Sequence, residues 1–226
     1  MISIIMPTFN AAPHLARSLS PLVPAVADGV VRELVVSDGG STDDTIAIAE
    51  DVGARIVTGA RGRGAQLIAG AAVAKSPWLL FLHADTALAD NWSDETARFI
   101  AQPQNGTRAA SFRFAFDDNS LGANVVTFWV GVRNRALALP YGDQGLLISR
   151  ALYDSLGGYR DLPLMEDVDM VRRIGRARLQ MLNARAVTSA EKYRRDGFGK
   201  RSRRNLVLLA RYFMGADPAD LAKRYD

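Results

Sequence analysis

Polar side chains follow the first two apolar segments of the chain, where they can bind a polar ligand. Asp38 comes after the segment ELVVS and before two glycines, so its carboxylate can reach a ribose hydroxyl or a base N–H while the glycines let a nucleotide approach the backbone. The alternative is that Asp38 only organises a turn. Thr8 and Asn10 follow the apolar run 2–6 and could line the same base pocket or cap the next helix.

Two arginines alternate with glycines in the stretch GARGRGAQ, directly before an expected helix. Backbone N–H groups at a helix start and guanidinium groups both bind phosphate oxygens. We therefore expect Arg61 and Arg63 to face a phosphate, with a solvated loop as the alternative. The stretch is not a Walker A loop, because it lacks the Gly-Lys-Ser/Thr ending.

His83 and Asp85 follow five apolar residues, 78–82, which predict a buried strand. A carboxylate held at the end of a strand can bind Mg²⁺ or Mn²⁺ that bridges a diphosphate. His83 could be a second ligand, a ribose or phosphate contact, or a histidine that is satisfied at the strand end. Because imidazole suits Mn²⁺ better than Mg²⁺, Mn²⁺ is the preferred metal.

Glu166 and Asp167 open an expected helix after the residues PLM. Paired acids at this position gain from the helix dipole, which is one explanation for them. The other is general-base chemistry, since transfer of a group to an alcohol requires a carboxylate that takes the alcohol's proton. Both explanations stay open on the residues alone.

Three more residues of the second half could bind a ligand rich in hydroxyl groups. Asp143 and Gln144 lie between an expected long helix and a short strand, beyond a proline. Tyr159 follows two glycines and could either place its ring beside a sugar or pack within its own loop.

Short apolar segments alternate with helical patterns over the first ninety residues. The expected strands are 2–6, 33–37, 54–58 and 78–82. Such alternation predicts βαβ units, and therefore a mostly parallel, Rossmann-like α/β sheet with helices on both faces. Ligands of such sheets bind beyond the carboxyl ends of the strands, where the candidate loops of this half lie.

The pattern after Asp85 predicts a mixed α/β half. Helices are expected at 91–101, 121–139, 166–176 and 206–213, and strands at 109–116 and 145–148. The segment 109–116 alternates as an antiparallel or edge strand should. We expect one domain, because no linker or repeat divides the chain.

The motifs PTFN, SDGGSTDDT, GARGRGAQ and LFLHADT, in this order, resemble the nucleotide-sugar half of family 2 glycosyltransferases of the GT-A fold. LPYGDQG, LGGY and PLMED resemble the acceptor half of that family, and the whole set is similar to a small soluble subgroup known as arsenosugar-biosynthesis glycosyltransferases. The resemblance implies a single domain over 1–226, with a nucleotide-sugar half at 1–90, an acceptor half at 91–190 and a basic helical segment at 191–226.

The resemblance also implies a function: a metal-dependent, inverting, hexosyltransferase-like enzyme that moves a sugar from a nucleoside diphosphate sugar, UDP by default, to a hydroxyl acceptor. Its implied donor-binding residues are Thr8, Asn10, Asp38, Arg61, Arg63 and Ala84, and its implied ligands to Mn²⁺ or Mg²⁺ are Asp85 and His83. Asp167 is the implied base, with Glu166 in reserve, and Asp143, Gln144 and Tyr159 would contact the acceptor or the sugar. The chain departs from the family's Asp-x-Asp metal motif, because His83 replaces the first Asp.

Two other functions stay open. Loss of one carboxylate from the metal motif is also expected of a catalytically inactive nucleotide-sugar-binding protein or a peripheral membrane module. A nucleotidyltransferase would share the loops that bind phosphate, but it would need a glycine-rich loop after the first strand, which PTFN does not supply.

Composition and charge exclude several classes of protein. With 48% hydrophobic and 23% charged residues the chain is not intrinsically disordered, and with no cysteine it has no disulfide or thiolate metal site. The start, MISIIMPTFN, lacks a basic region and a cleavage site, and we find no apolar stretch of the roughly 20 residues that cross a bilayer. We therefore expect a cytoplasmic protein.

The net charge of +4 is distributed unevenly. Residues 172–226 hold 15 Lys and Arg against 5 Asp and Glu. Because like charges repel, we expect a mobile loop at 192–204 that closes over the donor diphosphate, with peripheral contact to an anionic membrane as the competing prediction. The stretch has no recognisable nucleic-acid-reading motif, so nucleic acid is not an expected partner.

Overall fold

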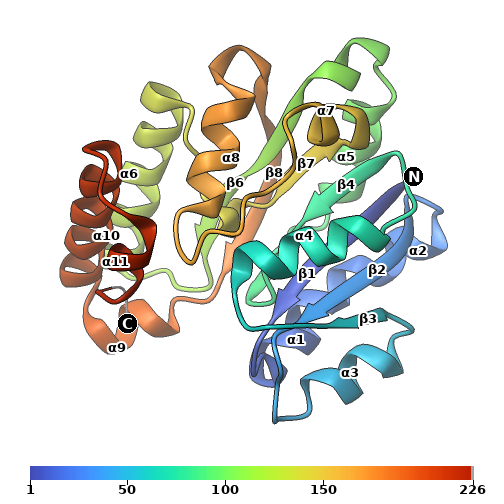
Figure 1. The fold of residues 1–226 in the computed structure, drawn as a ribbon, viewed down its shortest axis with the longest axis horizontal. Coiled ribbons are helices and arrows are strands. Elements are labelled where there is room, and N and C mark those ends of the chain that lie inside the picture. Colours follow the sequence, from blue (N-terminus) through green and yellow to red (C-terminus); the bar gives the residue numbers. More distant parts are fainter. Residues whose placement is uncertain (225–226) are drawn as a thin grey trace.

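The computed structural model describes residues 1–224, which form one mixed sheet flanked by helices (Figure 1). Within these residues the sheet has eight strands in the order β3-β2-β1-β4-β7-β6-β8-β5. The strands are β1 (Ile2–Thr8), β2 (Val31–Asp38), β3 (Arg55–Thr58), β4 (Trp78–Phe81), β5 (Thr86–Leu88), β6 (Ala109–Phe116), β7 (Leu146–Ser149) and β8 (Leu179–Thr188).

The helices surround this sheet. The α-helices are α1 (Ala12–Leu19), α2 (Val23–Ala27), α3 (Thr45–Asp51), α4 (Arg63–Val73), α5 (Trp92–Ile100), α6 (Leu121–Leu137), α7 (Arg150–Ser155), α8 (Glu166–Ile174), α9 (Glu191–Asp196), α10 (Phe198–Phe213) and α11 (Pro218–Ala222). Short 3₁₀ helices are η1 (Ser20–Leu22), η2 (Pro103–Thr107), η3 (Gly142–Gln144) and η4 (Arg176–Arg178).

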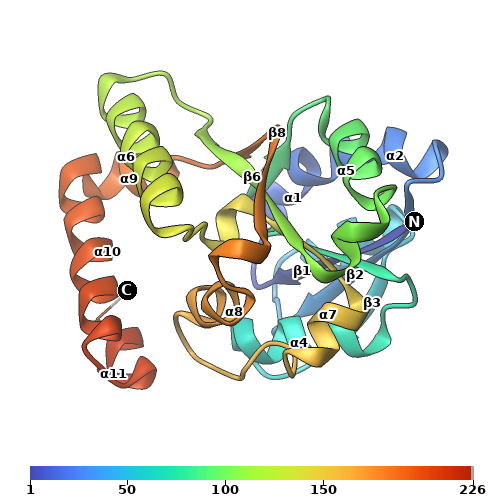
Figure 2. The same ribbon diagram turned by 90° about the horizontal axis from the view of Figure 1, so that it is seen from above.

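The first four strands of the predicted parallel half are confirmed. β1 pairs in parallel with β2 and β4, and β2 pairs in parallel with β3. β1 and β4 are largely apolar without alternation because both faces of the sheet are covered there, whereas β3 lies at the edge of the sheet and is partly exposed. Helices α1, α2 and α5 pack on one face and α4, α7 and α8 on the other, as Figure 2 shows. The register aligns Thr8 with Asp38, and Asp38 with Thr58, so the loops after these strands open at one edge.

The second half of the sheet is mixed, as expected, but two strands that complete it, β5 and β8, were not predicted. β6 has the predicted bounds and pairs antiparallel with β7, which is one of the two predicted alternatives; the other is excluded, because parallel β8 covers its second side. In β8 the buried positions include Leu182, Ala184 and Ala186, with exposed Asn183 and Arg185 between them, so its alternation is carried by small side chains.

The basic C-terminal segment is helical, as predicted for 191–226, of which residues 225 and 226 lie outside the described part. The prediction of a loop over 192–204 is wrong, because α9 and α10 occupy this stretch and meet at Gly197, whose φ is +87°. Like charge does not keep the segment open, since Asp196 forms ion pairs with Arg195 at 2.8 Å and with Arg201 at 2.6 Å. None of the helices in residues 1–224 is long and apolar enough to cross a membrane.

Candidate active site

Five ionisable side chains gather beyond the carboxyl end of β4. His83 and Asp85 follow that strand, Arg63 opens α4, Asp143 lies in η3 and Asp167 lies in the first turn of α8. The charges of Arg63, Asp85 and Asp167 act on the pKa of His83 and also on the pKa of Asp143. The fold therefore brings together the residues predicted to hold the metal, to act as base and to contact the acceptor.

Asp38 organises the loop after β2 from a fully buried position. Its Oδ1 accepts hydrogen bonds from Thr8 Oγ1 at 2.8 Å and Ser41 Oγ at 2.5 Å, and its Oδ2 accepts from the Gly40 and Ser41 amides at 2.8 and 2.7 Å. Burial alone would raise the pKa of Asp38, but these bonds outweigh burial and hold the pKa below its usual value. Four hydrogen bonds engage all lone pairs of the carboxylate, as expected if Asp38 organises the turn. A direct contact between Asp38 and a nucleotide stays a prediction.

Asn10 ties the loop after β1 to the loop after β2. The Asn10 side-chain oxygen Oδ1 accepts a hydrogen bond from the Thr42 backbone N–H at 2.9 Å. The backbone N–H of Asn10 donates to Ser41 Oγ at 2.8 Å. The residue has a left-handed φ of +48°, a conformation that asparagine tolerates better than most side chains. The exposed Asn10 therefore joins two loops and does not cap the next helix, and its place in a base pocket stays a prediction.

Gln66, which the sequence analysis did not single out, fixes α4 to the ends of two strands. Its buried amide nitrogen donates to the carbonyls of Thr8 and Ser37, both at 2.7 Å. Gly64 lets the start of α4 pack closely on the segment before α8, because a Cβ there would lie 2.6 Å from the Arg160 carbonyl oxygen. The signal was present in the motif GARGRGAQ, whose final residue is polar at a position that packs on the sheet.

The two arginines of that motif have different surroundings. The Arg61 guanidinium lies over the ring of Phe9, 4.1 Å from its centroid, and the residue is exposed. Arg63 Nε lies 3.1 Å from Glu166 Oε1, and one third of its side chain is exposed. Both guanidinium groups are at least partly exposed to solvent, so the predicted contact of each with a phosphate stays a prediction. Arg63 also forms an ion pair with the buried Glu166.

The loop His83-Ala84-Asp85 is held from both sides. Ser18 Oγ donates to the Ala84 carbonyl at 2.6 Å, and the Ser189 amide donates to the Asp85 carbonyl at 3.1 Å. Burial, assisted by the positive charge of Arg63, lowers the pKa of His83 from 6.5 to about 4. The imidazole is therefore neutral at physiological pH, which is the form that binds metal ions.

The donor set of this loop fits a divalent metal ion only together with oxygens from a ligand. Within residues 1–224, no three acidic or histidine side chains lie close enough to hold a metal by themselves. The Asp85 carboxylate receives one long contact, from Thr86 Oγ1 at 3.4 Å, so it retains lone pairs for a hard cation. One carboxylate and one imidazole match Mn²⁺ or Mg²⁺ if a diphosphate supplies the remaining ligands.

Asp167 is held at the start of α8 with part of its carboxylate accessible. Its Oδ2 accepts the Gly142 amide at 2.7 Å, and its Oδ1 accepts the Val168 amide at 2.7 Å. Met165, directly before the helix, has a left-handed φ of +67°, which turns the chain so that the acids come first. Each carboxylate oxygen keeps a free lone pair, so Asp167 can accept a proton.

Glu166 differs from its neighbour because its side chain is only 1% exposed. Burial raises the pKa of Glu166 to about 7, Asp167 raises it further and Arg63 opposes the rise. Glu166 therefore titrates near neutrality, and its buried carboxylate is paired with Arg63. It is therefore less suited than Asp167 to meet an acceptor.

Asp143 is the third acid of the site. Its Oδ1 is buried and has no hydrogen-bond partner among the described residues. Burial raises the pKa of Asp143 to about 7, with Asp167 and Asp85 adding to the rise and Arg133 opposing it. The Arg133 guanidinium stacks on the Tyr141 ring, 3.5 Å from its centroid, so the cation sits beside η3.

Gln144 and Tyr159 are both buried, and their predicted contacts with acceptor or sugar stay predictions. Gln144 is fully buried, its amide nitrogen donates to the Phe112 carbonyl at 2.9 Å, and its oxygen accepts from Arg133 and Asn134. Tyr159 is 6% exposed and packs edge-on against Phe81, with ring centroids 4.9 Å apart. Both residues hold the walls of the site together, which is the packing alternative for Tyr159.

Comparison with known proteins places this arrangement in a family. A family model described as glycosyl transferase family 2 matches residues 3–147. A PGL/p-HBAD biosynthesis glycosyltransferase from Mycobacterium bovis (BCG Pasteur strain) is 36% identical over 120 residues, which cover 45% of this chain and 41% of that protein. The match thus spans less than half the length of this curated relative.

Solved structures share the fold at low sequence identity. Glucosyl-3-phosphoglycerate synthase from Mycobacterium tuberculosis, in complex with Mn²⁺, UDP and glucosyl-3-phosphoglycerate, has a TM-score of 0.54 at 22% identity and covers 84% of this chain and 70% of its own. S. aureus TarS 1-349 has a TM-score of 0.63 at 15% identity, with 99% and 70% covered. The predicted GT-A fold is confirmed, and because the family model matches more than half of its residues, the chain belongs to glycosyl transferase family 2.

Proposed function

We propose that this protein transfers a sugar from a nucleoside diphosphate sugar to a hydroxyl acceptor, with inversion at the anomeric carbon. The observation that carries the proposal is the gathering of Asp85 and Asp167 near His83, with Asp143 close to the same two carboxylates, at the strand ends of a family 2 fold. The arsenosugar subgroup, the single-domain organisation over 1–226 and a cytoplasmic location stay predictions.

The donor is expected to lie across the loops after β1, β2, β3 and β4. The loop ordered by Asp38 and Asn10 would receive the nucleoside, and Arg61 and Arg63 would face the diphosphate. UDP is our proposed nucleotide, supported by the presence of UDP in the structurally similar synthase. The backbone at Ala84, in the loop after β4, is also an expected donor contact.

Asp85 and His83 would hold a divalent metal together with the diphosphate. Mn²⁺ accompanies UDP in the similar synthase, which supports the same ion here. When bound, such an ion offsets the negative charge that grows on the leaving diphosphate. Arg63 adds a second positive charge on the same side of the site.

Asp167 would act as the general base. The acceptor oxygen forms a bond to the anomeric carbon while the bond from that carbon to the diphosphate breaks, and the hydroxyl proton passes to Asp167. Attack from the face opposite the leaving group inverts the configuration. The amides of Gly142 and Val168 hold the carboxylate still during this transfer. Asp143 would contact the acceptor.

The test begins with binding. Thermal shift with UDP, GDP, CDP and dTDP, each with and without Mn²⁺, should reveal selective stabilisation by one nucleotide, because ligand binding to the folded state raises its stability. Release of nucleoside diphosphate from a panel of nucleotide sugars then measures turnover. Binding without any release, in the presence of diverse hydroxyl acceptors, would favour the inactive sugar-nucleotide-binding alternative.

Two variants with matched controls assign the roles. Asp85→Ala should abolish the Mn²⁺-dependent part of nucleotide binding, whereas Asp90→Ala, which changes an exposed acid five residues later, should not. Asp167→Asn keeps the shape but cannot take a proton, so turnover should fall about 10²- to 10⁴-fold with nucleotide affinity nearly unchanged. Asp161→Asn on the exposed loop before α8 is its control. Near-normal turnover of Asp167→Asn would move the base to Glu166 or Asp143.

A further inference from the structure

Helix α6 presents a row of large apolar side chains to solvent. Within this helix only Ala123 is buried. Leu121, Val125, Phe128 and Trp129 are 85%, 55%, 65% and 62% exposed. Their spacing of four, three and one residues places them on one face of the helix. Several large apolar side chains that are exposed together on a folded domain mark an interaction surface.

Helix α10, which packs beside α6, carries a second set of exposed apolar side chains. Leu206 and Val207 are 66% and 50% exposed, and Phe213 and Met214 at the end of the helix are 46% and 78% exposed. The two helices pack together where Gly122 meets Phe198, since a Cβ on Gly122 would lie 2.8 Å from that ring. Figures 1 and 2 both place α6 and α10 side by side, at the end of the molecule farthest from the N-terminus.

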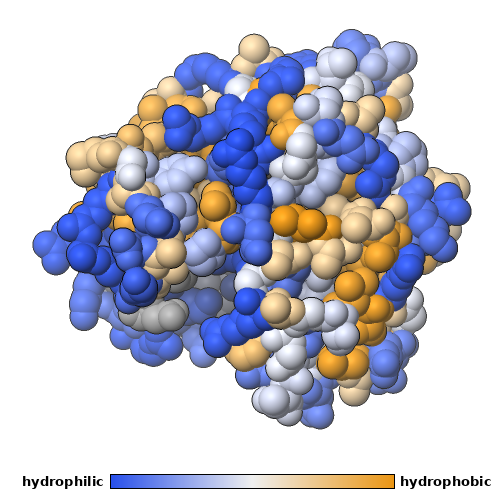
Figure 3. Space-filling model, viewed as in Figure 1, coloured by the Kyte–Doolittle hydropathy of each residue, from blue (hydrophilic) through white to orange (hydrophobic). Residues whose placement is uncertain are grey.

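Positive charge accompanies the apolar residues. Residues 191–213 contain eight Lys and Arg against two acidic residues. Several of these arginines are paired with acids, but Lys200 and Arg203 are exposed and form no ion pair with any residue in 1–224. Figure 3 shows tan and orange residues over this end of the molecule beside a dense blue area.

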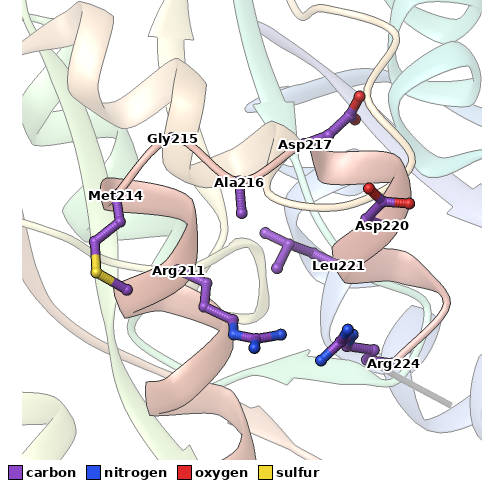
Figure 4. Close-up of a pocket in the computed structure, with 8 residues that line it drawn as sticks. All are labelled: Arg211, Met214, Gly215, Ala216, Asp217, Asp220, Leu221 and Arg224. Atoms are coloured by element: carbon purple, nitrogen blue, oxygen red, sulfur yellow. The ribbon is translucent and has the colours of Figure 1, made fainter.

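A hollow of about 450 Å³ lies between the end of α10 and α11, next to the same surface. Figure 4 shows Arg211 and Arg224 extending toward each other, with Met214 at the edge of the hollow, and Asp217 and Asp220 also line it. Two converging guanidinium groups attract a phosphate group. The hollow is separate from the candidate active site, none of whose residues line it.

We propose that α6 and α10 form a docking surface for an anionic lipid bilayer, with their apolar side chains inserted at the headgroup boundary and Lys200, Arg203 and the arginines of the hollow contacting lipid phosphates. Aromatic residues with exposed apolar neighbours and a basic rim are the composition of interfacial helices. A second copy of the chain fits less well, because a two-fold contact would place the same unpaired cations of both copies against each other.

Such docking would leave the candidate active site close to the membrane surface. Helix α6 carries Arg133 and Asn134, whose side chains bind Gln144 in the wall of that site. The docking surface and the active site are therefore joined by one helix. The proposal does not depend on the proposed function, since its test measures membrane binding alone.

Vesicle sedimentation tests the proposal on the full chain. Vesicles of phosphatidylcholine with phosphatidylglycerol should bind the protein, and vesicles of phosphatidylcholine alone should bind it at least about tenfold more weakly. Phe128→Ser with Trp129→Ser should abolish binding, and Lys200→Glu with Arg203→Glu should weaken it about tenfold or more. Val23→Ser with Val26→Ser removes apolar residues that are 61% and 55% exposed on α2, and it should bind like the wild type.

A spectroscopic measurement reports on the surface directly. Of the three tryptophans, Trp129 is 62% exposed on α6, Trp92 is 1% exposed in the core, and Trp78 is half-buried at the start of β4, where it packs on Phe99. Lipids that carry a quencher in the acyl chain should therefore quench Trp129 and leave the other two unchanged. The quenching should disappear in Trp129→Phe. Absence of sedimentation with anionic vesicles, or equal loss in the α2 control, would overturn the proposal. So would a stable dimer, in sedimentation velocity, that the Phe128 and Trp129 substitutions dissociate.

Discussion

The Arg63 guanidinium lies 3.1 Å from the Glu166 carboxylate and joins the first residue of α4 to the first residue of α8. One partner belongs to the loop expected to face the diphosphate, and the other precedes the proposed base, Asp167. The pair therefore links the donor side of the site to the acceptor side. Although Arg63 opposes it, burial raises the pKa of Glu166 to about 7.

The first prediction is that Glu166 makes the stability of the fold depend on pH. Its pKa in the folded state, about 7, lies above its ordinary value of 4.5. Between these two values the folded state binds more protons at Glu166 than the unfolded chain does, so the free energy of unfolding falls as the pH rises through this window. Arg63 limits the fall, and the charge of Asp167 increases it.

Urea titrations of the wild type and Glu166→Gln at about pH 5 and about pH 7.5 measure this effect. The amide does not ionise, so the variant should lose less stability than the wild type between the two conditions. Asp143 contributes the same slope to both proteins and cancels in the difference. An equal loss in both proteins would show that Glu166 does not titrate in this range.

A second prediction concerns Gln66, whose amide nitrogen binds the carbonyls of Thr8 and Ser37. Gln66→Leu keeps the size of the side chain but removes two buried hydrogen bonds, so the free energy of unfolding should fall by about 1–3 kcal/mol. Nucleotide binding should weaken as well, because the loops that follow both strands lose their anchor. Gln104→Leu at an exposed position is the control. Unchanged melting temperature and affinity in Gln66→Leu would contradict this role.

The parallel half of the fold could be predicted because buried strands there are continuous apolar runs. The expected strand 78–82 corresponds to β4, Trp78–Phe81. β8 escaped prediction because alanines fill its buried positions, while Asn183 and Arg185 give it a polar appearance. The basic stretch 192–204 was expected to be mobile because a count of like charges ignores Asp196, which pairs with its arginines in the folded chain.

The site could be predicted at the level of loops but not of individual atoms. Residue types show which loops are polar, whereas the engagement of each oxygen depends on tertiary contacts. The Asp38 carboxylate accepts hydrogen bonds from its own loop, and the Gln144 side-chain amide forms hydrogen bonds to β6 and α6. The role of Gly142 could not be predicted from the LPYGDQG motif, because this glycine makes room for His83, which belongs to another loop.

A third prediction separates packing from ligand contact at Tyr159. The ring fills the space beside Phe81, and burial together with the negative charge of Asp167 raises the pKa of the Tyr159 hydroxyl well above its usual value. Tyr159→Phe should therefore keep near-normal stability and turnover. Tyr159→Ala should lose about 3–5 kcal/mol of stability because it leaves a cavity. A Tyr159→Phe variant with normal melting temperature and strongly reduced turnover would restore the predicted contact with sugar or acceptor.

The last prediction is that Gly142 cannot be replaced without damage to the catalytic centre. A Cβ at this position would lie 2.5 Å from His83 Nε2 and 3.4 Å from Asp167 Oδ2. Real Cβ atoms do not approach other atoms as closely as the first distance, so Gly142→Ala must displace the imidazole, η3 or both. Because the Gly142 amide also holds Asp167, turnover should fall more than tenfold, and Mn²⁺-dependent nucleotide binding should weaken.

Gly131→Ala in α6 provides the matched control, because a Cβ there would meet no atom within 4 Å. In a helix interior this change should stabilise the fold by up to about 1 kcal/mol and leave turnover unchanged. Thermal unfolding and nucleoside diphosphate release, measured on both variants, separate a local effect from a global one. If Gly142→Ala keeps full turnover and full Mn²⁺-dependent binding, then neither His83 nor Asp167 needs its present position, and the proposed roles of both must be reassigned.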